Sequence, residues 1–428
     1  MSRSDSEVVT TDVVSRRAVL ATGGAGLGAT VAGCTDVVGR AAGESEPVTI
    51  AVLEDRSGAF EASGTPKWQA SRLAIDELND DGGILGREIK LVDPDPESDD
   101  NRYQRLTQDL LRDGNIDALW AGYASSAREA IRPLVNDYEQ LYFYTTLYEG
   151  GVCDRYTFLP GATARQQLGI IVPYLIEEYG GRIYSIAADY NYGHLSTDWV
   201  RVLAAENGGE VIEREYVPLA QDEFGDLLDR IETADPDVVV SNLVGGAHAS
   251  FYAQNAEREY DVPIGTPLML GDGAHRQFDP PTFANVYTGV NYMEELPTDR
   301  NEAFVERFYD AFPDAAYVSQ EAQNNYFSTH LYAQAVEAAG TTDQQAVIEQ
   351  LETGMVIEAP QGDVEVDGAT HHMNHTMRIA RCDANHEIEF HDDQRVDETF
   401  LSDTVGCDLR EIAETRQYTP TWYYREVQ

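Results

Sequence analysis

Short apolar runs alternate regularly with longer segments of helical periodicity along this chain, and few folds are compatible with such a pattern. Residues 48–54 read VTIAVLE, a run rich in β-branched residues, which predicts a buried strand. Residues 66–78 place Trp68, Leu73 and Leu78 near one face, which predicts an amphipathic helix. The pattern continues with a strand at 88–93, a helix at 103–111, a strand at 117–122, a helix at 126–138 and a strand at 141–146. Such alternation predicts a parallel, doubly wound sheet.

A second series of the same kind follows. It comprises helices at 166–179, 195–207, 224–233 and 247–260, each followed by a strand, at 182–189, 210–218, 237–244 and 267–271. Beyond it, the pattern predicts a strand at 286–293 and helices near 300–312, 321–339 and 343–351. We therefore expect an α/β protein with two doubly wound parallel-sheet lobes. The expected parts are 48–147 with 273–355 as the first lobe, 148–272 with 356–390 as the second, and 391–428 as a C-terminal extension.

The N-terminus has the layout of an export signal. Arg16 and Arg17 precede a weakly apolar, Gly/Ala-rich run that ends in VAGC at 31–34. The paired arginines resemble a twin-arginine signal, and VAGC resembles a lipoprotein cleavage box in which Cys34 becomes the lipidated first residue. We expect residues 1–33 to be a signal peptide and 34–47 a linker, so that lipid tethers the mature chain to the outer face of the cell membrane. The alternative is a short disordered tail with a chance pair of arginines.

The net charge is −45, and lysine occurs only at Lys67 and Lys90. Such a surface repels nucleic acid, whose backbone is also anionic. Self-repulsion destabilises the compact state at ordinary salt, but at molar salt the Debye length falls to roughly 3 Å and the repulsion is screened. The composition therefore indicates a high-salt environment, with an acidic protein at ordinary salt as the alternative.

Beyond Cys34 the chain has three cysteines, Cys153, Cys382 and Cys407. Export permits disulfides. We expect Cys382 to pair with Cys407 because both lie in the C-terminal segment, while three thiols leave the connectivity open. No CxxC spacing occurs, so these residues give no zinc or redox signature.

Neutral polar side chains gather where the predicted strands end. They are Tyr123, Ser125, Tyr144, Thr146 and Tyr190. In an open α/β sheet ligands bind outside the carboxyl ends of the strands, so we expect these side chains to form one rim. Hydroxyls can both donate and accept hydrogen bonds, which suits a small ligand that is uncharged or zwitterionic. The pattern favours a solute receptor over an enzyme.

Eight motifs occur in a fixed order along the chain. They are SGAFEASG at 57–64, ELNDDGGILGREIKL at 77–91, AGYASSAREAIRPL at 121–134, YTTLYEGG at 144–151, TARQQ at 163–167, DY at 189–190, GGEVIEREYVPL at 208–219 and EAPQGDVEV at 358–366. Together they resemble the type I solute-binding proteins of ABC importers, over roughly residues 48–390. Within that family the chain is most similar to the urea and short-chain amide branch, in the form of a haloarchaeal-type exported lipoprotein. The resemblance implies a type I periplasmic binding protein fold, with two lobes joined by three crossovers that close on a ligand.

The resemblance also implies which residues hold the ligand. Matched position by position, they are Tyr123, Ser125, Tyr144, Thr146, Tyr190 and Tyr192. A ring of hydroxyls can satisfy urea or an amide without burying an unpaired charge, and it rejects analogues that lack the polar group. The implied function is capture of urea or a short-chain amide and delivery to an ABC permease and ATPase complex. No cofactor is expected.

Asp272 departs from the amide pattern. It lies in LGDGAH at 270–275, where branched-chain amino acid binders carry the acid that holds the α-ammonium group. A buried carboxylate facing a neutral amide is unfavourable, whereas one paired with an ammonium is compensated. Asp272 therefore keeps open a branched-chain or related amino acid as the ligand. The other interpretation is an exposed acidic turn in an acid-rich chain.

Other functions find less support. His371, His372 and His375 form a small cluster, but no HExxH motif or cysteine partner accompanies them, so we expect no metal site. The acidic stretch 93–100 lacks the glycine and terminal glutamate of a calcium loop. No GxxxxGK[ST], GxGxxG or GxSxG motif occurs, and no activated nucleophile is visible, so we expect no enzymatic activity. A ligand sensor without transport is a further alternative.

Overall fold

The computed structural model describes residues 46–258 and 260–424, so the predicted signal peptide and Cys34 lie outside the described residues. The first part contains β1 (Val48–Leu53), α1 (Glu61–Asp80), β2 (Ile89–Val92), α2 (Asp100–Asp113), β3 (Ala118–Ala121), α3 (Ser125–Asp137), β4 (Tyr142–Phe143), β5 (Val152–Asp154) and β6 (Thr157–Phe158). The second contains α4 (Ala164–Tyr179), β7 (Arg182–Ala188), α5 (Asn191–Glu206), β8 (Glu210–Val217), α6 (Gly225–Ala234), β9 (Val238–Asn242), α7 (Gly246–Asn255), β10 (Ile264–Thr266), a 3-10 turn η1 (Leu270–Asp272), α8 (Ala274–Gln277) and β11 (Val286–Val290). The last contains α9 (Asp299–Ala311), α10 (Gln320–Ala339), α11 (Gln344–Leu351), β12 (Val356–Ala359), β13 (Gly362–Val366), β14 (Met373–Cys382), β15 (Ile388–Val396), α12 (Phe400–Val405), β16 (Thr415–Gln417) and α13 (Pro420–Tyr423).

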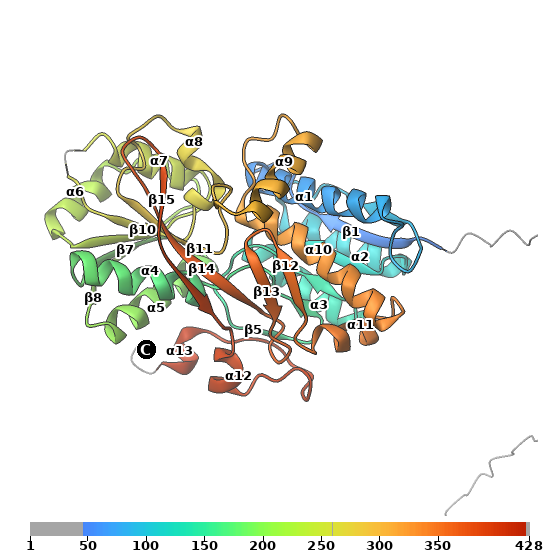
Figure 1. The fold of residues 1–428 in the computed structure, drawn as a ribbon. Helices are drawn as coiled ribbons and strands as arrows, with labels where there is room; N and C mark the ends of the chain where they lie inside the picture. The colour runs from blue at the N-terminus through green and yellow to red at the C-terminus, as the bar shows by residue number, and fades with distance from the viewer. Residues whose placement is uncertain (1–45, 259, 425–428) are drawn as a thin grey trace, which may run out of the picture. The chain divides into compact units, whose positions relative to one another are not determined.

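The first sheet has five parallel strands in the order β2-β1-β3-β4-β6. Both of its faces are covered by helices, as a parallel sheet requires. Helices α1, α10 and α11 lie on one face, and α2 and α3 lie on the other (Figure 1). Along β1, Ile50 and Val52 pack with the first group of helices, and Ala51 and Leu53 pack with the second. The predicted βαβα alternation is thus confirmed in this part of the chain.

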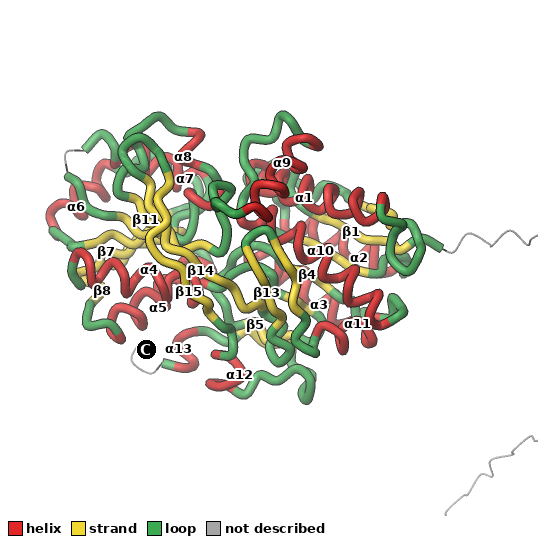
Figure 2. The backbone as a smooth tube through the Cα atoms, in the orientation of Figure 1, coloured by secondary structure: helices red, strands yellow, loops and turns green. Residues whose placement is uncertain are grey.

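The second sheet combines parallel and antiparallel strands in the order β12-β13-β14-β11-β10-β9-β7-β8, with β15 added beside β14 (Figure 2). Its parallel part, β8 to β11, carries α6 and α7 on one face and α4 and α5 on the other. The chain therefore forms two helix-covered α/β units, in agreement with the predicted fold class.

The chain passes from one sheet to the other three times: after β6, after β11, and again between α11 and β14. The third passage is part of the second sheet, yet Ile357, Val364 and Met373 pack in the same hydrophobic cluster as β1. Further along β14, Met377 and Ile379 belong to the cluster of α4 and α5. This passage therefore adds apolar side chains to both cores. The exact division of the chain into lobes stays a prediction.

The disulfide joins Cys153 of β5 to Cys407, and the predicted pairing of Cys382 with Cys407 is wrong. Cys382 is a buried free thiol at the end of β14. Its hairpin with β15 leads the chain away from it, and α12 then brings Cys407 to β5, where the Cα atoms of the bonded pair lie 6.1 Å apart. Bridging depends on that distance and not on separation in sequence. Next to the disulfide, β16 pairs with β5, so the C-terminal segment is held against the first part of the chain.

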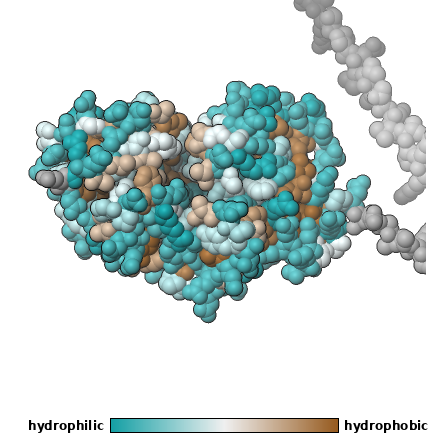
Figure 3. Space-filling model, turned by 90° about the horizontal axis from the view of Figure 1, so that it is seen from above, coloured by the Kyte–Doolittle hydropathy of each residue, from teal (hydrophilic) through white to brown (hydrophobic). Residues whose placement is uncertain are grey.

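The face seen in Figure 3 is mostly hydrophilic, as the excess of acidic residues leads one to expect. Among residues 46–258 and 260–424, no helix combines the length and apolarity needed to cross a membrane.

Candidate functional site

Six of the seven side chains predicted to bind ligand lie just beyond the carboxyl ends of parallel strands. They are Tyr123 and Ser125 after β3, Tyr144 and Thr146 after β4, and Tyr190 and Tyr192 after β7. Since β3 and β4 belong to the first sheet and β7 to the second, the site draws on both sheets.

These six residues line one pocket, and three apolar residues that sequence reasoning missed complete it: Leu147, Val244 and Leu268. Each of the three lies within a few residues of a strand end, which is the signal that could have found them. The cavity volume is about 10 Å³, room for about one water molecule. None of the nine residues that line the pocket has a charged side chain.

Three of the pocket hydroxyls donate their protons to the protein itself. Tyr144 donates to the Tyr123 backbone carbonyl at 2.6 Å, and Thr146 donates to the Gly122 carbonyl at 3.1 Å. Ser125 donates to Glu149 Oε2 at 2.6 Å. Carbonyl and carboxylate oxygens only accept, so these hydroxyls keep acceptor lone pairs as their remaining capacity. A ligand meeting them has to offer N–H or O–H donors.

A buried lysine, Lys67, contacts one of the residues that line the pocket. Lys67 Nζ lies 2.8 Å from Glu54 Oε2 and donates to Thr146 Oγ1 at 2.9 Å and to the Gly122 carbonyl at 2.8 Å. Gly122 has a φ of +93°, a conformation that favours glycine. Burial raises the pKa of Glu54 to about 7, although Lys67 and a hydrogen bond from Asn325 act in the opposite direction. Sequence reasoning missed Lys67, whose one distinguishing signal is that lysine is rare in this chain.

Asp272 lies outside the set of residues that line the pocket. It ends η1 and lies close to Glu321, in the first turn of α10. Burial raises the pKa of Glu321 well above its usual value, and the nearby Asp272 charge adds to this; burial also raises the pKa of Asp272. Burial raises the pKa of the Tyr123 and Tyr192 phenols, and the nearby charges of Asp272 and Glu321 add to this, so the two acids lie near that side of the pocket. The interpretation of Asp272 as an exposed acidic turn is wrong, and Glu321 was not predicted.

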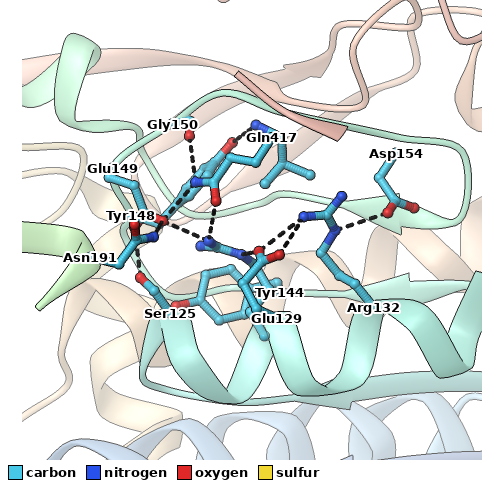
Figure 4. A network of polar contacts seen from close by, with 12 residues as sticks. Ser125, Glu129, Arg132, Tyr144, Tyr148, Glu149, Gly150, Asp154, Asn191 and Gln417 are labelled. Atoms are coloured by element: carbon cyan, nitrogen blue, oxygen red, sulfur yellow. Dashed lines mark hydrogen bonds and ion pairs between the residues drawn. The ribbon is translucent and has the colours of Figure 1, made fainter. Parts of the chain in front are cut away.

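Another buried acid, Glu149, lies next to Ser125 (Figure 4). Its carboxylate accepts hydrogen bonds from Ser125, Arg128, Asn191 and Gln417. Burial raises the pKa of Glu149, but the charge of Arg128 and the hydrogen bonds outweigh burial, so the pKa lies below its usual value. Glu149 is therefore ionised at neutral pH.

The three clustered histidines have separate partners. His371 contacts Glu352 at 3.0 Å, His375 contacts Gln361 at 2.9 Å, and His372 contacts the Tyr148 hydroxyl. Burial lowers the pKa of His372 and of His375 to about 3, so both are neutral. Within the described part of the chain no group of three or more His, Cys, Asp or Glu side chains could hold a metal ion.

Asp189 is exposed and contacts His194 of α5 at 2.9 Å. Its side chain is not among those that line the pocket.

Comparison with known proteins identifies the family. The profile of the family described as periplasmic binding protein matches residues 47–387. The chain belongs to the periplasmic binding protein family. The chain is similar in sequence to the Leu/Ile/Val-binding protein homolog 6 of Brucella abortus (strain 2308). The two are 21% identical over 351 residues, which cover 79% of this chain and 89% of the relative.

Solved periplasmic binding proteins have the same fold. The chain is similar to the branched-chain amino acid transporter substrate binding protein LivJ of Streptococcus pneumoniae in complex with isoleucine, with a TM-score of 0.70, 19% identity and coverage of 82% of this chain and 99% of that protein. It is also similar to a solute binding protein of an ABC transporter from Rhodopseudomonas palustris BisB5 in complex with 3,4-dihydroxy benzoic acid, with a TM-score of 0.73, 20% identity and coverage of 82% and 97%. The type I fold expected from the motifs is thereby confirmed.

Proposed function

We propose that this protein captures urea or a short-chain amide outside the cytoplasm and delivers it to an ABC permease. The observation that carries the proposal is the pocket itself: it joins neutral hydroxyl side chains from both sheets, and three of those hydroxyls donate to the protein.

The hydrogen-bonding capacity of the pocket matches that of an amide. Ser125 and Tyr144 have acceptor lone pairs left for the N–H groups of a ligand. Tyrosine hydroxyls such as those of Tyr190 and Tyr192 can donate to a carbonyl oxygen. Urea and short-chain amides offer both N–H donors and one carbonyl acceptor and carry no charge, in keeping with the neutral lining.

The small cavity also favours a small ligand. With a volume of about 10 Å³, the pocket accepts even a small solute only when its walls move apart. Lobe opening and closure supplies that motion, and a ligand shifts the equilibrium by its differential affinity for the closed state. The transport role rests on family membership and on relatives described as solute binding proteins of ABC transporters. The twin-arginine and VAGC motifs support export and lipid tethering at Cys34.

A second candidate ligand is a branched-chain or related amino acid. Asp272 favours it, because the acid pair of Asp272 and Glu321 near Tyr123 and Tyr192 could hold an α-ammonium group. The name of the Brucella relative points to the same class of ligand.

Titration calorimetry in molar KCl separates the two candidates. We expect urea or acetamide to bind the wild-type protein and Asp272→Asn with affinities within a few-fold of each other, and leucine to bind neither. Leucine binding that is abolished in Asp272→Asn would instead establish the amino acid as ligand. Absence of binding by all three compounds would overturn the proposed function.

A further inference from the structure

The middle residue of the Tyr-Glu-Gly motif at 148–150 gathers four separate hydrogen-bond donors. Glu149 is 1% exposed. Its Oε2 accepts from Ser125 Oγ at 2.6 Å. Its Oε1 accepts from Arg128 Nη2 at 2.6 Å, from Asn191 Nδ2 at 2.8 Å and from Gln417 Nε2 at 2.7 Å (Figure 4).

These donors come from three segments that are far apart in the sequence. Ser125 is the first residue of α3, which is packed on the first sheet. Asn191 is the first residue of α5, which is packed on the second sheet, and it stands between the pocket residues Tyr190 and Tyr192. Gln417 is the last residue of β16 in the C-terminal segment. One carboxylate thus ties the pocket segments of both sheets to each other.

We propose that Glu149 is a positioning residue for ligand binding. Its carboxylate holds Ser125 and the Tyr190–Tyr192 segment in fixed positions relative to each other, and Gln417 of the C-terminal segment helps to hold that carboxylate in place. The inference rests on the proposed function in that the pocket between these segments is the ligand site. Glu149 then contributes to ligand binding although it does not line the pocket, and the C-terminal segment contributes through Gln417.

Arg128 connects Glu149 to a further pocket residue, Tyr144. Its guanidinium lies 5.0 Å from the centre of the Tyr144 ring and 4.8 Å from that of Tyr148. Arg128 is buried, and among the described residues it forms ion pairs with Glu149, which is buried, and with Glu129, which is partly exposed. Loss of the Glu149 charge would leave Arg128 and three neutral donors around a group that cannot accept from all of them.

Glu149→Gln tests the inference, because it keeps the shape of the side chain and replaces one acceptor oxygen by a donor. Hydrogen bonds to charged groups are worth enough that we expect affinity for urea or acetamide to fall by at least about tenfold. Asn191→Ala and Gln417→Ala should each weaken binding less. In the Glu149→Gln background, Asn191→Ala should have little further effect, because the two residues act through one contact.

Asp154→Asn is the matched control for a merely structural role. Asp154 is a fully buried acid that bonds Arg132 and Asn136 of the same helix α3, and it does not line the pocket. We expect Asp154→Asn to lower the unfolding temperature while leaving affinity within about twofold of wild type. If the affinities of Asp154→Asn and Glu149→Gln fall together in proportion to lost stability, or if Glu149→Gln binds like wild type, the inference is overturned.

A ligand-free measurement keeps the test independent of the proposed function. Absence of binding by the wild type would count against the proposed function alone. Amide hydrogen exchange without ligand should then show faster exchange in the first two turns of both α3 and α5 in Glu149→Gln, and in α3 but not α5 in Asp154→Asn. Unchanged exchange in α5 of Glu149→Gln would overturn the positioning role.

Discussion

Lys67 Nζ lies 2.8 Å from Glu54 Oε2, and neither side chain of this ion pair is exposed to solvent. The pair is in contact with the pocket, because the Lys67 ammonium donates hydrogen bonds to Thr146, which lines the pocket, and to the Gly122 carbonyl. A buried ion pair is strongly destabilised when one partner is removed, since the other charge is left without compensation. The pocket therefore depends on the ion pair of Lys67 and Glu54, although neither residue lines the pocket.

Replacing Lys67 with methionine should destabilise the fold by about 3–5 kcal/mol at pH 8. The loss should be smaller near pH 6, where Glu54 is mostly protonated because its pKa is about 7. Thermal unfolding in molar KCl at both pH values measures this. Lys67→Met combined with Glu54→Leu should recover much of the loss, and equal losses for the single and double variants would contradict the account.

Glu54 itself should make stability fall as pH rises. Burial raises its pKa from the usual 4.5 to about 7, so between these values the folded state binds more protons than the unfolded state. Stability from this group is then lost as pH rises from about 4.5 to about 7. Glu54→Gln should remove this part of the pH dependence. The exposed Glu358→Gln is the control and should follow the wild-type curve.

Glu321→Gln should raise the unfolding temperature, and it should raise it more as the pH rises. Burial and the Asp272 charge raise the pKa of Glu321, so ionisation at higher pH is unfavourable in the folded state. An amide can donate to Asp272 at every pH, which removes this cost. Scanning calorimetry across pH 5 to 8 checks the effect, and a variant that is less stable than wild type throughout would refute it.

Ser125→Ala should weaken binding of urea or acetamide by up to about tenfold, since a neutral hydrogen bond contributes roughly 0.5–1.5 kcal/mol. Tyr190→Ala should weaken it further, because it removes one wall of the pocket. Ser126→Ala is the control, because Ser126 is the exposed neighbour on the same helix. Titration calorimetry measures all three, and unchanged affinity in both pocket variants would remove these residues from the site.

Peptide mapping under non-reducing conditions should recover Cys153 linked to Cys407, with Cys382 alkylated only after unfolding because it is buried. Cys407→Ser should lower stability by about 2–5 kcal/mol. Cys382→Ala should leave the disulfide intact. A linked peptide containing Cys382 would contradict the pairing.

Much of the site could be predicted from the sequence because it follows a local rule. Tyr123, Tyr144 and Tyr190 each follow a strand whose apolar run is visible in the sequence, and parallel strands bring such positions to one edge. Glu149 and Gln417 follow no such rule. They lie 268 residues apart, and their contact depends on β16 pairing with β5.

The sequence alone predicts the α/β alternation and five of the neutral pocket residues, because periodicity and strand ends are properties of neighbouring residues. The sixth, Tyr192, was predicted only from the resemblance to the family. The tertiary structure adds which cysteines bond, which acids are buried, and the hydrogen bond of Lys67 to Thr146 in the pocket. Burial and long-range proximity depend on how helices and sheets pack. The sequence therefore does not show whether a given aspartate or glutamate faces water or a lysine. The sequence leaves Asp272 open between a ligand contact and a surface turn, whereas in the structure it lies beside a second acid, the buried Glu321.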